Sequence, residues 1–196
     1  MTLADLQSDF LRGRKGALSL PMTGVVNYGI AAAASLLVAP AHANLALTLC
    51  FWAIPPVAAI IGRLRGEDFR GRPDNPLFQL SKLARVMVLS TWAIHVPVWI
   101  HAPELFPLTV GIAFGLHWVV FGWSIGRPLG LVHLALRATL VPAAWHAAPD
   151  NRMGAVAAAV AFCYLISLWQ LSRVWHAAEQ RPVLAGEGPS GRLTFT

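Results

Sequence analysis

The sequence predicts an all-α fold: a polytopic membrane bundle of six transmembrane helices that follows a short amphipathic helix at the N-terminus. Of its 196 residues, 56% are hydrophobic and only 12% are charged, whereas an ordinary globular domain carries about a quarter charged residues. Several apolar stretches reach the ~20 residues that a helix needs to cross a bilayer. Basic residues gather in alternate loops, a pattern typical of multi-pass membrane proteins. This composition excludes disordered, collagen-like and coiled-coil chains.

The N-terminal segment, residues 1–20, has apolar side chains at helical spacing. Leu3, Leu6 and Phe10 recur on one side of a helical wheel, with Asp5 elsewhere on it. A helix with one apolar and one polar face lies in the membrane interface. We therefore expect a short amphipathic interfacial helix on the cytoplasmic side.

Six apolar segments follow, each long enough to span the hydrocarbon core. They are residues 21–40, 44–62, 86–103, 105–126, 128–147 and 153–172. Together they form one transmembrane domain, residues 21–172. The polar remainder, residues 173–196, is expected to be a disordered cytoplasmic tail.

Ala41-His42-Ala43 has the small-x-small pattern of a signal-peptidase site. Against cleavage, Asn27 and Tyr28 interrupt the apolar run before it, and a long segment with acidic residues precedes that run. Signal peptides have a basic n-region and a short apolar h-region. We therefore expect an uncleaved first span, while cleavage would leave five spans with the same orientation of the C-terminus.

The orientation follows from Lys and Arg, which are enriched in cytoplasmic loops. With six spans, thirteen of the 15 basic residues fall on one side, Arg152 falls on the other, and Arg137 lies inside a span. The thirteen are Arg12, Arg14, Lys15, Arg63, Arg65, Arg70, Arg72, Lys82, Arg85, Arg127, Arg173, Arg181 and Arg192. Both termini are therefore expected in the cytoplasm. The same rule accounts for the basic stretch 63–85, where we expect contact with anionic lipid head groups and no nucleic-acid partner.

Three short motifs give the chain a resemblance to other proteins. They are Ser8-Asp9-Phe10-Leu11-Arg12-Gly13-Arg14-Lys15-Gly16, Asn75-Pro76-Leu77, and Gly115-Leu116-His117 followed by Trp123. Together they resemble a family of small uncharacterised bacterial polytopic inner-membrane proteins of unknown function. The resemblance implies a bacterial cytoplasmic (inner) membrane. It implies no activity and no catalytic residue.

The most informative polar residue is Arg137, near the middle of the fifth predicted span. Arginine at that depth costs about 2.5–3.5 kcal/mol to insert, and no predicted span contains Asp or Glu to neutralise it. Pro142 leaves the carbonyl of Ala138 without its helical donor. Arg137 therefore either caps backbone carbonyls or binds an anion or proton-linked ligand. His133, one turn away, projects from the same helical face.

Polar side chains on other predicted spans extend this candidate site. Those that we group with Arg137 and His133 in a shared polar interior are His117, His95, Thr91 and Tyr164. For each histidine the alternative is an interhelical hydrogen bond, worth about 0.6 kcal/mol on average. Two G-x-x-x-G pairs, Gly111 with Gly115 and Gly122 with Gly126, predict close helix packing.

Three functions remain open on these observations. The first is a small transporter or channel-like protein for an anion or a proton-coupled solute, with Arg137 as its fixed charge. The second is a non-catalytic assembly or regulatory partner that forms homo- or hetero-oligomers through small-residue helix faces. The third is a membrane redox protein with haem b on His117 and His133. We otherwise predict no cofactor, metal or catalytic residue, because nucleotide, zinc-protease and hydrolase motifs are absent and Cys50 and Cys163 are isolated.

Overall fold

The computed structural model describes residues 1–67, 72 and 74–180, and within these residues it contains helices and no strand. The α-helices are α1 (Leu3–Gly13), α2 (Ser19–Ala34), α3 (Ala43–Trp52), α4 (Ile54–Arg65), α5 (Pro76–Ser90), α6 (Trp92–His101), α7 (Phe106–Ala113), α8 (His117–Ser124), α9 (Leu129–Ala147) and α10 (Arg152–Glu179). Short 3-10 turns are η1 (Lys15–Ala17), η2 (Pro40–His42), η3 (Pro103–Leu105) and η4 (Pro149–Asn151). The all-α prediction is confirmed for this part of the chain.

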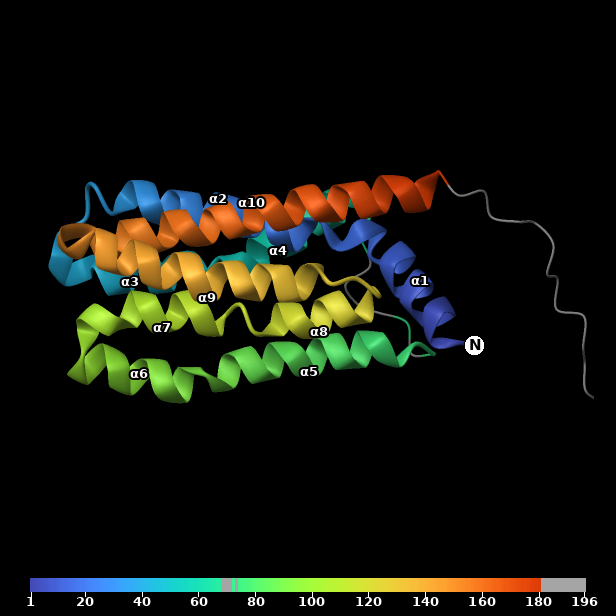
Figure 1. Cartoon of the computed structure of the whole chain (residues 1–196), viewed down its shortest axis with the longest axis horizontal. Helices are drawn as coiled ribbons and strands as arrows, with labels where there is room; N and C mark the ends of the chain where they lie inside the picture. The colour runs from blue at the N-terminus through green and yellow to red at the C-terminus, as the bar shows by residue number, and fades with distance from the viewer. Residues whose placement is uncertain (68–71, 73, 181–196) are drawn as a thin grey trace, which may run out of the picture.

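Most of the helices lie side by side as long rods, and three rods consist of two helices in line (Figure 1). These are α3 with α4, α5 with α6, and α7 with α8. Ala53 interrupts the first rod just before Pro55 and Pro56, which have no N–H to donate to the preceding turn. Thr91 interrupts the second, and its hydroxyl donates to the carbonyl of Val88 at 2.6 Å, a bond that bends helices.

Five helical segments are long and apolar enough to cross a membrane. They are Lys15–Ala34, Pro40–Arg65, Pro76–His101, Pro103–Ser124 and Pro149–Glu179. The fifth predicted span corresponds to α9, which has 19 residues but is not among the five, because Arg137 and two histidines lower its hydropathy. A membrane protein is thus supported, while the predicted count of six spans is not confirmed.

Several helices run past the boundaries that hydropathy predicted. The third span was expected from residue 86, but α5 begins at Pro76, where the side chain of Asn75 accepts a hydrogen bond from the N–H of Leu77 at 3.0 Å. An asparagine N-cap followed by proline is a strong helix start. The last helix reaches Glu179 rather than residue 172. The rest of the predicted disordered tail, residues 181–196, lies outside the described residues.

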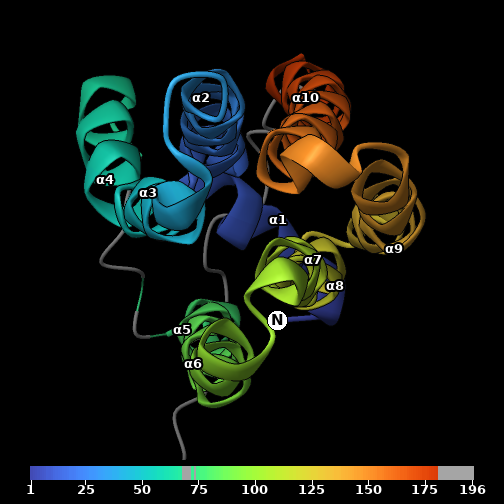
Figure 2. The same cartoon turned by 90° about the vertical axis from the view of Figure 1, so that its left-hand side faces the viewer.

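Seen along the rods, α2 packs beside α10, α10 beside α9, and α9 beside α7 and α8 (Figure 2). The α3–α4 rod packs against α2, and the α5–α6 rod packs against α8 and α7. Helices α2, α7, α8, α9 and α10 therefore surround the centre of the bundle, while α3–α6 form its rim.

Helix α1 lies across the end of the rods (Figure 1). Its start is a capping box, in which the hydroxyl of Thr2 accepts from the N–H of Asp5 and the Asp5 carboxylate accepts from the N–H of Thr2. Phe10 is fully buried, with its ring 4.9 Å from that of Phe78 in α5, while Leu3 is exposed. The predicted N-terminal helix is confirmed, and part of its apolar face packs on the protein itself.

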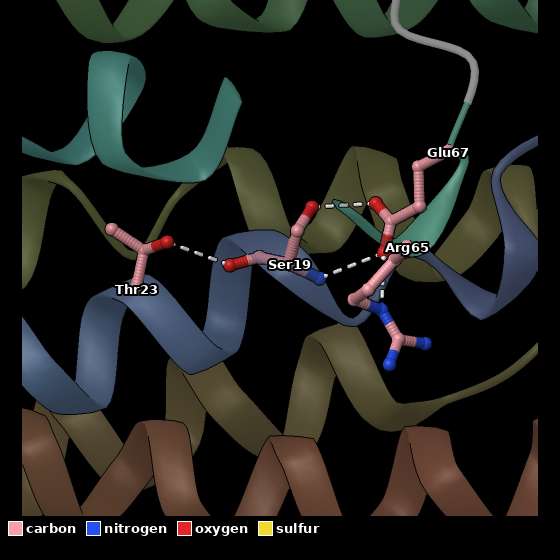
Figure 3. A network of polar contacts seen from close by, with 4 residues as sticks. All are labelled: Ser19, Thr23, Arg65 and Glu67. Carbon is pink, nitrogen blue, oxygen red and sulfur yellow. Dashed lines mark hydrogen bonds and ion pairs between the residues drawn. The ribbon is translucent and has the colours of Figure 1, made fainter. Parts of the chain in front are cut away.

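A buried carboxylate fixes the segment after α4 to the start of α2 (Figure 3). Glu67 accepts hydrogen bonds from the N–H and hydroxyl of Ser19 and from Nε of Arg65. The first N–H groups of a helix lack partners within it, and its N-terminus favours negative charge. Glu67 therefore caps α2, and the Thr23 hydroxyl extends the network by donating to the Ser19 carbonyl.

Candidate functional site

Arg137 is completely buried near the middle of α9. Its Nη1 donates to the carbonyl of Gly111 at 2.9 Å. That carbonyl lacks its usual helical donor, because the N–H of Gly115 turns to the carbonyl of Ile112 where α7 ends. Arg137 therefore caps the break between α7 and α8. The carbonyl that it binds belongs to a neighbouring rod and is not that of Ala138, which the sequence had suggested.

Two glycines give the site its space. A Cβ on Gly115 would lie 2.6 Å from Cδ of Arg137, and a Cβ on Gly24 in α2 would lie 2.7 Å from the ring of Tyr164. Interiors are packed too closely to absorb such overlaps without a shift. Alanine at either position would therefore displace the neighbouring polar side chain.

Two tyrosine rings enclose the guanidinium. Its central carbon lies 5.0 Å from the ring centroid of Tyr164 and 5.8 Å from that of Tyr28, within the range of a cation–π interaction. The rings stack on each other with centroids 5.8 Å apart. Tyr164 was predicted for this site, whereas Tyr28 was not; its only signal was the polar pair Asn27-Tyr28 inside an apolar run.

The charge of Arg137 is not neutralised by another side chain of the described residues. A guanidinium has five N–H donors, yet Nε and Nη2 of Arg137 are buried and form no hydrogen bond within residues 1–67, 72 and 74–180. The ion pairs found in those residues lie elsewhere, at Arg65–Glu67, Arg72–Asp9 and His176–Glu179. A buried charge without a partner is costly, so these donors are available to an anion.

His133 is fully buried one turn before Arg137. Its Nδ1 lies 2.7 Å from the hydroxyl of Ser167, and this hydroxyl donates to the carbonyl of Cys163 at 3.0 Å. Since the hydroxyl proton is used there, Nδ1 of His133 is the donor, and Nε2 carries the free lone pair. The imidazole stacks on Trp118, with centroids 4.3 Å apart. Nε2 has no hydrogen-bond partner among the described residues and is placed to accept a proton or hydrogen bond.

His117 faces a different part of the interior. It lines a cavity of about 100 Å³ between α2, α5 and α8, together with Tyr164 and Trp118. Tyr164 thus borders both this cavity and Arg137. The proposal that His117 and His133 ligate a haem is not tested by this arrangement and stays a prediction.

His95 and Thr91 do not join the Arg137 cluster. Nδ1 of His95 lies 3.2 Å from the hydroxyl of Thr109, and its ring meets the edge of Phe114 in an aromatic group that includes Trp92. The hydroxyl of Thr91 donates to the carbonyl of Val88 in α5. Of the predicted site residues, the structure therefore brings together Arg137, His133 and Tyr164, and Tyr164 also lines the cavity at His117.

The small residues form contacts within the chain. A Cβ on Gly111 would lie 2.8 Å from Val141, and one on Gly122 would lie 2.6 Å from the backbone nitrogen of Gly130. These glycines let α7 and α8 approach α9 closely, as the G-x-x-x-G spacing predicted. Gly126 differs, because it has a φ of +65° and faces Gln7 of α1.

In a comparison with known protein families, the family described as "Family of unknown function (DUF7010)" matches residues 3–173. No curated protein and no solved structure matches the chain. The matched residues extend from α1 through most of α10 and include Arg137, His133, Tyr164 and the glycines around them. The chain belongs to this family of unknown function.

Proposed function

We propose that this protein is a multi-pass membrane protein of the bacterial inner membrane that binds and conducts a small anion, with Arg137 as its fixed positive charge. The observation that carries the proposal is the buried guanidinium, which uses one nitrogen on a backbone carbonyl and leaves two without partners in the described residues. An interhelical hydrogen bond contributes about 0.6 kcal/mol, and the cation–π contacts with Tyr28 and Tyr164, near the outer end of their range, add about 0.5–1 kcal/mol each. Together these are less than the ~2.5–3.5 kcal/mol cost of the charge. An anion would offset the remainder.

Topology forms part of the proposal, with α9 as a sixth span. Helix α9 runs beside α10 and the α7–α8 rod (Figure 1), and His133 and Arg137 face protein rather than lipid. Helix α1 and the last turns of α10 lie at the same end of the rods, as an even number of crossings requires. The positive-inside rule then favours a cytoplasmic location for both termini.

His133 supplies a second chemical group for this function. Its Nε2 carries a free lone pair one helical turn from the charge, so a proton could move with the anion. In this proposal Arg137 binds the anion. The bare charge of Arg137 opposes protonation of His133, so His133 accepts the accompanying proton only while the anion is bound.

The test is anion flux in proteoliposomes, with radiolabelled acetate, chloride and phosphate as separate probes. Arg137→Gln should reduce the flux of any anion that the native protein carries at least about tenfold, which corresponds to ~1.4 kcal/mol. Arg152→Gln is the matched control, because Arg152 stacks on Trp145 away from the site. Equal flux in native and Arg137→Gln proteins, or flux in neither above empty vesicles, would contradict the proposal. Co-purification with one stoichiometric partner would then favour the assembly function.

A further inference from the structure

The cavity beside His117 has an unusual combination of lining residues. Arg137 is not among its lining residues, and Tyr164 lines the cavity while its ring also lies 5.0 Å from the guanidinium of Arg137. Its wall is mainly apolar, and the aromatic rings of Phe114, Trp118 and Phe121 form one side. Such a wall favours a ligand that has a hydrocarbon body.

The charged part of the wall has a single sign. The cations that line the cavity are Arg14 and Arg85, the imidazole of His117 is a neutral polar group, and no Asp or Glu is found among the described lining residues. Arg85 lies on α5, one turn beyond Ser81, which also lines the cavity. The residues present therefore select for negative charge on a ligand.

A strained turn holds one side of this wall. Lys15, Gly16 and Ala17 have φ values of 43°, 78° and 53°, although positive φ is costly for residues other than glycine. Trp175 packs against Gly16 so closely that a Cβ there would lie 2.9 Å from it. The turn carries Arg14 and Ala17 to the cavity, and strained backbone of this kind gathers at functional sites.

The size of the cavity limits the ligand. A cavity of ~150 Å³ holds a benzene molecule, so about 100 Å³ accepts a body of about four to five non-hydrogen atoms. A strongly hydrated dianion gains little from aromatic walls. We propose that the cavity binds a short-chain monocarboxylate of two or three carbons, with its carboxylate towards Arg85 and its carbon chain against Phe114 and Trp118. That this monocarboxylate is the anion conducted by the protein rests on the proposed function of Arg137. That it binds in the cavity does not.

The binding test uses the full-length protein in detergent with propionate as the probe, measured by isothermal titration. Arg85→Gln removes the charge from an exposed position and should weaken propionate binding at least about tenfold. Ala84→Leu should do the same by filling the cavity, since Ala84 is buried in its wall. Lys82→Gln is the matched control, because Lys82 is an exposed cation of the same helix that does not line the cavity, and it should bind as the native protein does.

Three comparison ligands decide the chemistry. The uncharged 1-propanol and inorganic phosphate should each bind at least about tenfold more weakly than propionate. If 1-propanol bound as tightly as propionate, the cavity would not recognise the charge, and if phosphate did, the cavity would not recognise the carbon chain. Tighter binding of decanoate would point to a lipid-derived acid. Each of these results would overturn the proposal. Arg137→Gln separates the two hypotheses: it should keep propionate binding while losing flux. If Arg137→Gln loses flux but Arg85→Gln binds propionate as the native protein does, this inference is overturned while the proposed function stands.

Discussion

The centre and the rim of the bundle differ in how their helices use polar residues. Half of the most apolar window of Lys15–Ala34 is buried inside the protein, against 17% for Pro40–Arg65 and Pro76–His101 of the rim. Among the residues that the structure describes, the completely buried polar side chains belong to the central helices: Ser19, Thr23, Ser124, His133, Arg137 and Ser167. The rim offers mainly apolar side chains to its surroundings. Tight packing and the candidate chemistry therefore occupy the same helices.

The largest expected effect comes from forcing the central helices apart. A Cβ on Gly130 would lie 1.9 Å from the backbone oxygen of Trp118, so Gly130→Ala must separate α8 from α9. We expect a loss of about 3 kcal/mol or more, seen as little folded protein in size-exclusion chromatography. Gly29→Ala is the control, because nothing lies within 4 Å of a Cβ there; it should be neutral or gain up to ~1 kcal/mol. Normal folding of Gly130→Ala would refute the close contact.

Arg137→Met should separate stability from function at the centre. It removes an insertion cost of ~2.5–3.5 kcal/mol, one hydrogen bond of about 0.6 kcal/mol and two cation–π contacts of about 0.5–1 kcal/mol each. We expect the variant to melt at a higher temperature than the native protein in buffer without a binding anion. Adding chloride or another anion that the native protein carries should then raise the melting temperature of the native protein and leave that of the variant unchanged. A lower melting temperature would instead identify Arg137 as a structural cap for Gly111.

A pair of histidine substitutions compares the two regions directly. His133→Leu loses the 2.7 Å contact with Ser167 and the stack on Trp118, while His95→Leu loses a 3.2 Å contact with the half-buried Thr109. Interhelical hydrogen bonds range up to about 1.7 kcal/mol in membrane bundles. We expect about 1–2 kcal/mol for His133→Leu and less than ~0.6 kcal/mol for His95→Leu, measured by reversible unfolding in mixed micelles. Equal costs would remove the distinction between centre and rim.

Sequence patterns predicted the helices and the direction of individual side chains better than the distances between helices. The spacing of His133 and Arg137 correctly put both on one face, and the membrane class followed from hydropathy. The same Arg137 lowers the hydropathy of α9 although its side chain is buried, so composition alone does not decide the number of spans. The Gly111 carbonyl, the Tyr28 ring and the cavity at His117 depend on contacts between distant segments, which periodicity does not encode.

The smallest effect is expected at α1, outside both the centre and the rim. The Thr2 N–H and hydroxyl donate to the carboxylate of Asp5 at 2.7 and 2.8 Å, and these bonds hold the pKa of Asp5 below its ordinary value. A lowered carboxyl pKa means that the capping box stabilises α1 fully above the ordinary value of ~3.9 and loses this contribution as pH falls through the lowered pKa. Corrected hydrogen exchange in the first turn should therefore rise on going from pH ~6 to pH ~2, while exchange in the middle of α10 stays slow. Asp5→Asn should exchange faster in that turn at the higher pH and show little further change. A first turn that is equally protected at both pH values would mean that the Asp5 charge does not contribute to α1.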